Sequence, residues 1–256
     1  EHGLSPMKYY TYKYDFFQRA ALLFYPGEVF KRKMEAINPA FDRGLLGGYP
    51  KVDELIMMKI DRAELSRKFR LDPEKAIVLF APSWGGKNNP DAGIHNARYV
   101  AQFENVMIVP HSADYGLAKK YGAVKPGEGN INQFLHLADL VISDVSSVLA
   151  EASILNKPVI QLELPHYPGC FPEVEKRNSG TWISDEMNQK EQQTNRKERP
   201  FKIPYIDEDW IMGRTAKPNE LRASIQESLE HPEAFEKERA FWAEQSCWKA
   251  DGRSSL

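Results

Sequence analysis

The chain has 256 residues, of which 42% are hydrophobic and 27% charged, and its formal net charge at pH 7 is −2. This length and composition are typical of a soluble globular protein with one or two domains and a large core. A net charge so close to zero gives no general attraction for nucleic acid, so nucleic acid is not an expected partner. Cys170 and Cys247 form no disulfide framework or metal-binding spacing, which indicates a reducing compartment.

The first part of the chain predicts a strand and two helices. The apolar run at residues 20–25 indicates a short buried strand that ends at a Pro-Gly turn. Residues 28–37 place apolar side chains on one side, as an amphipathic helix does. A glycine-proline turn follows, after which Asp53 is expected to cap a helix over residues 55–65 that leads into the next domain.

A second run alternates strands and helices. Residues 76–81 and 106–111 predict strands, and residues 96–103, 118–121 and 132–137 predict helices. Ser83 follows the first of these strands and precedes a pair of glycines that allow a ligand to approach closely. His111 stands at the carboxyl end of the second strand. Open α/β sheets bind ligands at the carboxyl ends of their strands, which is where this side chain is expected.

The most informative stretch is a βαβ unit. Residues 140–142 predict a strand buried on both faces, residues 148–155 a helix, and residues 159–162 the next strand. Asp144, Ser146 and Ser147 lie in the loop before the helix. Two interpretations stay open: the serines cap the helix, or their hydroxyls and the free N–H groups of the first helical turn bind an anion.

The remaining sequence predicts a strand at residues 181–183, a polar insertion at residues 185–199, and helices at residues 219–229 and 232–245. Strands and helices therefore alternate along most of the chain, which predicts an α/β fold with doubly wound parallel sheets. Dinucleotide, Walker, HExxH and GxSxG motifs do not occur. No apolar run has transmembrane length, and no signal peptide opens the chain.

Several short motifs occur together in an order that resembles one enzyme family. They are His2-Gly3, Gly48-Tyr49-Pro50-Lys51-Val52-Asp53, Ala81-Pro82-Ser83-Trp84, His111, Asp144-Val145-Ser146-Ser147, Lys157-Pro158-Val159-Ile160 and Asp251-Gly252-Arg253-Ser254-Ser255. Their order and spacing resemble those of the CDP-glycerol glycerophosphotransferases, which make teichoic-acid and capsule polymers and have a GT-B glycosyltransferase fold. The resemblance implies two Rossmann-like units: residues 1–60 end the acceptor-side N-terminal domain, and residues 61–256 form the donor-binding C-terminal domain.

The resemblance also implies a chemistry and its residues. Glycerol phosphate would pass from CDP-glycerol to a polymer hydroxyl, with CMP leaving. His2 resembles the family's catalytic base, and His111 would lie near the transferred phosphoryl group. The donor diphosphate would be held by Asp144, Ser146, Ser147, Ser83 and Arg177. A ribose hydroxyl would be bound by Glu151. For Glu151 the other interpretation is a solvated helix residue. Lipid-linked acceptors would place the protein in the cytoplasm at the inner membrane face, as a peripheral partner.

Three other functions stay open. A UDP-N-acetylglucosamine 2-epimerase shares the GT-B architecture, but this chain has only one of that family's paired glutamates, Glu151. A sugar glycosyltransferase of capsule synthesis has the same fold, and fold alone does not fix the donor. A non-catalytic nucleotide-sugar binding module is the third. The sequence requires no cofactor, and it contains no clustered carboxylates that indicate a dedicated divalent-metal site.

Overall fold

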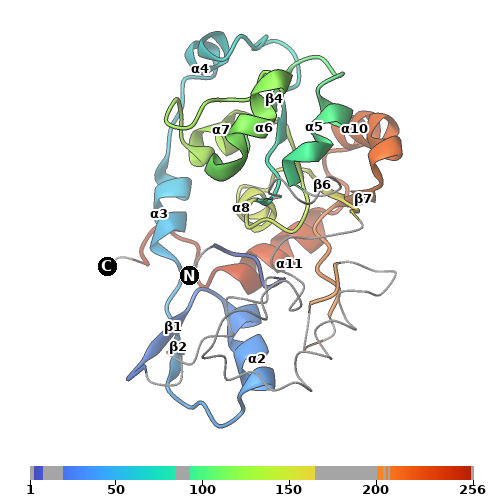
Figure 1. The fold of residues 1–256 in the computed structure, drawn as a ribbon. Coiled ribbons are helices and arrows are strands. Elements are labelled where there is room, and N and C mark those ends of the chain that lie inside the picture. Colours follow the sequence, from blue (N-terminus) through green and yellow to red (C-terminus); the bar gives the residue numbers. More distant parts are fainter. Residues whose placement is uncertain are drawn as a thin grey trace.

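The computed structural model describes residues 3–7, 20–84, 93–164, 201–203, 206 and 208–254. The predicted strand at residues 181–183 and the insertion at residues 185–199 lie outside them. The described residues form two parallel sheets, one of two strands and one of five. In Figure 1 the smaller sheet is at the bottom of the view, the larger one is above it, and the dark-blue N-terminal segment lies between them.

The smaller sheet pairs β1 (Leu23–Tyr25) with β2 (Gly44–Leu46), and α2 (Glu28–Ile37) connects them. The predicted helix at residues 28–37 is therefore confirmed. The strand at residues 20–25 was expected to be buried, and this was wrong in part, because Phe24 is 58% exposed and only Tyr25 is fully enclosed. β2 was not predicted, since its three residues contain only two apolar side chains and a glycine.

The expected single helix at residues 55–65 is two shorter helices. α3 (Pro50–Met57) begins with a proline, which suits the first helical position. α4 (Arg62–Lys68) has Asp61 as its N-cap, and the Asp61 side chain accepts a hydrogen bond from the backbone N–H of Glu64. Asp53 is thus not a cap but a buried residue inside α3, since the helix begins at Pro50, five residues before the predicted start at residue 55.

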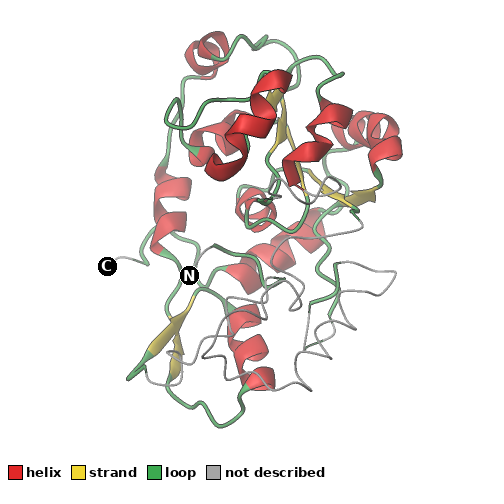
Figure 2. Cartoon of the chain, viewed as in Figure 1, coloured by secondary structure: helices red, strands yellow, loops and turns green. Residues whose placement is uncertain are grey.

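The larger sheet has the strand order β4-β3-β5-β6-β7, and all its pairs are parallel. Its strands are β3 (Val78–Phe80), β4 (Val106–Ile108), β5 (Leu140–Ser143), β6 (Val159–Leu162) and β7 (Arg214–Ala216). β3, β5 and β6 are buried throughout, as strands covered on both faces are. Helices flank these strands on both sides (Figure 2). β7 was not predicted, because it lacks an apolar run.

Short helices connect these strands. They are α5 (Ala97–Val100), α6 (Tyr115–Ala118), α7 (Ile131–Leu137) and α8 (Val148–Ile154), with 3₁₀ turns at Gly93–Asn96, Ser112–Asp114 and Lys119–Tyr121. A further 3₁₀ turn at Pro218–Glu220 leads into α10 (Leu221–Glu230), and α11 (Glu236–Ser246) follows. Apart from turns at their ends, these are the predicted helices, with one exception: the helix predicted at residues 118–121 is mostly the 3₁₀ turn Lys119–Tyr121, and α6 precedes it.

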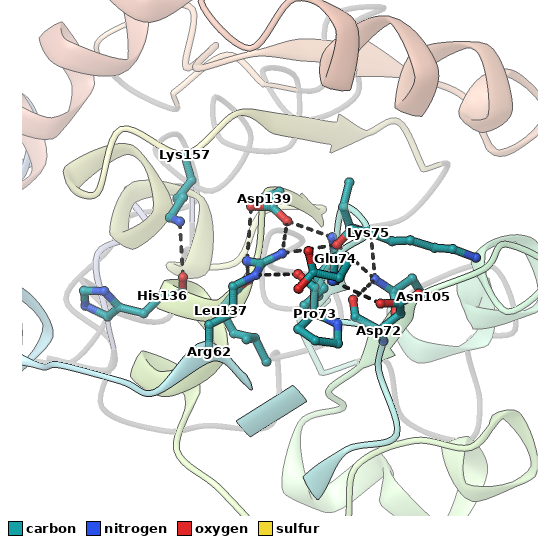
Figure 3. Close-up of polar contacts among 12 residues, drawn as sticks. Arg62, Asp72, Pro73, Glu74, Lys75, Asn105, His136, Leu137, Asp139 and Lys157 are labelled. Carbon is teal, nitrogen blue, oxygen red and sulfur yellow. Dashed lines mark hydrogen bonds and ion pairs between the residues drawn. The ribbon is translucent and has the colours of Figure 1, made fainter. Parts of the chain in front are cut away.

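A network of polar contacts fixes the amino edge of the larger sheet (Figure 3). Arg62 at the start of α4 donates to the Asp139 carboxylate, with 2.7 Å between Nη2 and Oδ2, and to the carbonyl oxygen of Leu137. Asp139 also accepts from the backbone N–H of Ile77. Burial lowers the pKa of nearby Lys157, against the opposing effect of Asp139. This network lies at the opposite edge of the sheet from the strand ends considered below.

The helix α11 connects the two sheets, because it contacts both α8 and α2. Arg32 on α2 donates to Gln245 on α11 over 3.0 Å and forms an ion pair with Glu208. The backbone N–H of Trp248, just after α11, donates to the carbonyl oxygen of Pro26. Among the residues that the structure describes, no helix is both long and apolar enough to cross a membrane.

Candidate functional site

The order of the larger sheet places its ligand-binding edge between β3 and β5. The chain leaves β3 toward β4 on one side, whereas it leaves β5 toward β6 on the other. The loops after these two neighbouring strands therefore diverge, and such a point in a parallel sheet is where ligands bind. The loop after β3 carries Ser83, and the loop after β5 carries Asp144, Ser146 and Ser147. The structure thus brings together four of the predicted donor-binding residues.

A hydrogen bond joins the two loops. Oδ1 of Asp144 accepts from the backbone N–H of Ser83 at 2.9 Å and from that of Val145 at 2.7 Å. Ser143 reinforces the junction, since its hydroxyl donates to the carbonyl oxygen of Ala81 at 2.6 Å. Asp144 and Ser83 are both buried. The Asp144 carboxylate therefore holds the two loops at a fixed spacing.

The two serines differ in what their hydroxyls do. Ser146 is buried, and its Oγ accepts from the backbone N–H of Val148 at a long 3.4 Å. Ser147 is the residue before α8, but its side chain makes no capping hydrogen bond. The interpretation of Ser147 as a side-chain cap is therefore wrong, because its backbone already has helical angles. α8 has only seven residues, so its dipole adds little to the site, and the hydroxyls matter more.

The N-terminal segment at residues 3–7 lies against this loop. The Ser5 hydroxyl donates to the carbonyl oxygen of Val145 at 2.6 Å, and a Cβ atom on Gly3 would lie 2.6 Å from Oγ of Ser147. Leu4 and Met7 are buried, and buried Lys33 on α2 donates to the carbonyl oxygen of Pro6 at 2.5 Å. His2 lies outside the described residues, but its neighbour Gly3 touches the loop at residues 144–147, which we call the serine loop.

His111 is exposed and caps the 3₁₀ turn Ser112–Asp114, where its Nδ1 accepts from the backbone N–H of Ala113 at 3.3 Å. It follows β4, which is the second strand from β5. Two strand spacings amount to about 10 Å, so His111 is on the same edge as the serine loop but to one side of it. Arg177 lies outside the described residues.

Glu151 is on the first turn of α8 and has a side chain only 2% exposed. It is therefore not a solvated helix residue. Lys51 on α3 donates to its Oε1 at 2.7 Å. The sequence motif that contains Lys51 was recognised, but a role for its ammonium group was not, because no spacing rule connects α3 with α8.

Three buried oxygen atoms at this edge have no hydrogen-bond partner within the described part of the chain: Oγ of Ser83, Oδ2 of Asp144 and Oε2 of Glu151. Buried polar atoms are rarely left unpaired, so such atoms at a ligand-binding edge are available to a ligand. Hydroxyls can donate to phosphate oxygens, and carboxylates can accept from ligand hydroxyls. Within the described residues, no group of three or more His, Cys, Asp or Glu side chains could hold a metal ion.

A parallel sheet that carries hydroxyl-bearing loops where the loops after β3 and β5 diverge defines a class: the α/β proteins that bind a ligand at the carboxyl edge of the sheet. A comparison with known families identifies one family within this class. Residues 25–165 match the family model described as CDP-Glycerol:Poly(glycerophosphate) glycerophosphotransferase, which is more than half of the chain. The chain belongs to this family, as its sequence motifs predicted. No curated protein matches it.

Several solved structures have a fold similar to that of this chain. The wall teichoic acid polymerase TagF aligns with a TM-score of 0.57 at 15% identity, over 93% of this chain and 56% of that one. A variant of TagF with a histidine changed to asparagine, soaked with CDPG, aligns with a TM-score of 0.55 at 16% identity, over the same shares. The UDP-GlcNAc 2-epimerase of Neisseria meningitidis aligns with a TM-score of 0.51 at 14% identity, over 86% of this chain and 56% of that one.

These likenesses confirm the predicted GT-B-like α/β fold, which TagF and the epimerase share with this chain. The chain spans little more than half the length of each of these structures. At such low identity they show the fold and do not choose between a cytidine and a uridine donor.

Proposed function

We propose that this chain is the donor-binding part of a transferase that moves glycerol phosphate from CDP-glycerol to a hydroxyl of a teichoic-acid or capsule-type polymer. Membership of the family supports this reaction. In it, the acceptor oxygen attacks the phosphorus that bears glycerol. The bond from that phosphorus to the bridging oxygen breaks, CMP leaves with the bridging oxygen, and the acceptor hydroxyl loses its proton.

The proposed roles follow from chemistry and position. His2 takes the proton of the acceptor hydroxyl, as an imidazole titrating near neutrality can. Ser146, Ser147 and Ser83 donate hydroxyl hydrogens to the diphosphate, while Asp144 holds their loops together. His111 donates to the charge that develops on the phosphoryl oxygens, and Arg177 adds a phosphate contact. Oε2 of Glu151 accepts a hydrogen bond from a ribose hydroxyl.

The observation that carries this proposal is the position of the segment at residues 3–7. The Ser5 hydrogen bond to Val145 and the close approach of Gly3 to Ser147 hold the residue after His2 against the serine loop. A base carried there would be next to a diphosphate bound by the serines. Acceptor hydroxyl, base and phosphorus could then meet without any large movement of the chain.

We further propose the domain arrangement that the sequence implies, with residues 1–60 ending an acceptor-side domain and residues 61–256 binding the donor. The separate two-stranded sheet of β1 and β2 supports this division. A lipid-linked polymer acceptor would bring the protein to a membrane surface as a peripheral partner, at the inner face of the cell membrane.

Calorimetry with CDP-glycerol, CDP, UDP-N-acetylglucosamine and UDP tests the donor. We expect cytidine-selective binding that a Ser146→Ala/Ser147→Ala double variant loses by at least about tenfold, since each lost hydrogen bond to a charged group costs about 1.5–3 kcal/mol. A Ser224→Ala/Ser228→Ala double variant in α10 is the matched control and should bind as wild type does. Preference for the uridine ligands would support an epimerase or a sugar glycosyltransferase instead.

A further inference from the structure

The ion pair between Lys51 and Glu151 joins two distant parts of the chain at the candidate site. Lys51 is the second residue of α3, which follows the two-stranded sheet, whereas Glu151 is on α8, which follows β5 of the larger sheet. Their charged atoms Nζ and Oε1 are 2.7 Å apart. The lysine side chain is 40% exposed and the glutamate side chain is 2% exposed. The buried carboxylate therefore depends on a cation that arrives from the other part of the molecule.

Only one of the two carboxylate oxygens of Glu151 takes part in this pair. Its Oε2 is buried and has no partner in the described part of the chain. An unpaired buried carboxylate oxygen is costly, so a ligand group that donates a hydrogen bond to Oε2 would remove this cost. Glu151 is four residues after Ser147, so the two side chains lie on one face of the helix, about one turn apart. The Glu151 carboxylate therefore lies about one helical turn from the serine loop.

The positive charge of Lys51 also reduces the repulsion between Glu151 and a bound diphosphate. A diphosphate bound at the serine loop would be repelled by a bare carboxylate one helical turn away. Lys51 offsets the charge of Glu151 and also fixes which carboxylate oxygen is free. The loop before α3 is itself held in place, since Gly48 has a φ of +70° and a Cβ atom there would lie 2.5 Å from Oγ of Ser254 and 2.9 Å from the carbonyl oxygen of Trp248.

We propose that Lys51 is a positioning residue, which holds the Glu151 carboxylate so that Oε2 accepts one ribose hydroxyl of the nucleoside diphosphate. This inference rests on the proposed nucleotide-donor function and names the group that organises its hydroxyl subsite. Lys51 acts through Glu151 and needs no contact with the ligand. Its removal should therefore cost recognition of one hydroxyl and leave the rest of the nucleotide contacts in place.

The test compares CDP with 2′-deoxy-CDP and 3′-deoxy-CDP by calorimetry on the full chain. UDP and its two deoxy forms are measured in parallel. We expect wild type to bind the ribose form about tenfold more tightly than one deoxy form, the range of a hydrogen bond to a charged group. Lys51→Met and Glu151→Gln should each bind the two forms nearly alike, and the double variant should lose no more than either single one.

Two matched variants complete the design. Lys51→Arg keeps the cation and should restore the discrimination. Lys75→Met removes a lysine from the exposed pair with Glu104, whose charged atoms are 3.3 Å apart, and should leave discrimination unchanged. Thermal unfolding of every variant identifies any that fails to fold. If Lys51→Met does not fold, Glu151→Gln and Lys51→Arg still test the subsite.

The inference is overturned if Lys51→Met retains the discrimination that Glu151→Gln loses, or if its affinities for ribose and deoxy forms fall equally. It is also overturned if Glu151→Gln discriminates as well as wild type. The same pattern of losses with uridine ligands in place of cytidine ligands would uphold the role of Lys51 while refuting the proposed donor. Binding of neither nucleotide by wild type would refute both.

Discussion

At the scale of single residues, His111 offers the clearest test of catalysis, because it is exposed and its side-chain hydrogen bond among the described residues lies within a surface turn. His111→Ala removes one hydrogen bond, from the N–H of Ala113, within a surface turn. We therefore expect little change in the unfolding temperature. If His111 donates to the developing charge, turnover should fall by about 10²–10⁴-fold, while the dissociation constant for CDP changes little.

His231→Ala is the matched control for this prediction, since the His231 side chain is also exposed, at 61%, and lies after α10. It should retain full turnover. A loss of donor affinity in His111→Ala with turnover at saturating donor unchanged would mean that His111 contributes to ground-state binding instead of catalysis.

At the scale of elements, the segment at residues 3–7 should tolerate no added bulk at Gly3. A Cβ atom there would lie 2.6 Å from Oγ and 2.7 Å from Cβ of Ser147, and Gly3 also has a φ of +127°. Gly3→Ala should push the segment and the serine loop apart. A displacement near 1 Å costs about a hundredfold in turnover, which a steady-state transfer assay would detect.

Gly127→Ala separates the steric effect from backbone strain. Gly127 also has a positive φ, of +88°, but a Cβ atom there meets nothing within 4 Å. This control should lower stability slightly and leave turnover intact. Normal turnover in Gly3→Ala would show that the contact between the segment and the serine loop is not needed for the reaction.

The end of α11 makes a prediction about pH. The pKa of the Cys247 thiol is raised from an ordinary value of 9.0 to about 11, chiefly by burial. A hydrogen bond from the backbone of Tyr49 opposes this rise, and the charges of Asp53 and Asp251 add to it. Between pH 9.0 and about pH 11, the Cys247 thiol is ionised in the unfolded chain and neutral in the folded chain. Unfolding then releases a proton, so the free energy of unfolding falls as pH rises above about 9.

Denaturant unfolding from pH 8 to about pH 11 measures this slope, and Cys247→Ala should make it shallower. Tyr25 is the comparison, because burial, with a smaller effect of Glu35, raises its pKa from 10.0 to about 12. Tyr25→Phe should therefore alter the slope only above pH 10. An unchanged slope in Cys247→Ala would show that the thiol ionises equally in both states.

At the scale of the whole molecule, the sequence predicted what local patterns determine. The strands β3, β5 and β6 were recognised because their side chains are apolar on both faces, and Ser83, Asp144, Ser146 and Ser147 because they follow such strands. The partly buried strands β2 and β7 were missed, since they form by pairing at a sheet edge and not through their own composition.

Contacts between distant segments could not be predicted in the same way. Lys51 meets Glu151 across 100 residues, and Ser5 meets Val145 across 140. No spacing rule applies at such separations, because the packing of α3, α8 and the N-terminal segment decides which side chains meet. Motif order suggested only that these segments belong to one site.

The helix α11 leads us to expect that the two sheets unfold together. It contacts α8 beside the larger sheet and α2 beside the smaller one. Arg32 on α2 binds Gln245 of α11 with 3.0 Å between Nη2 and Oε1 and forms an ion pair with Glu208. Far-ultraviolet circular dichroism and tryptophan fluorescence should therefore give coincident thermal transitions.

Arg32→Met should lower this single transition by about 1 kcal/mol of unfolding free energy, since the partly exposed guanidinium loses its charge-assisted hydrogen bonds. Lys31→Met is the matched control, because neighbouring Lys31 pairs only with Glu28 and Glu35 within α2, among the described ion pairs. It should change stability less. Two separate transitions in wild type would contradict this coupling, because α2 and its strands would then unfold without disturbing α8 and the larger sheet.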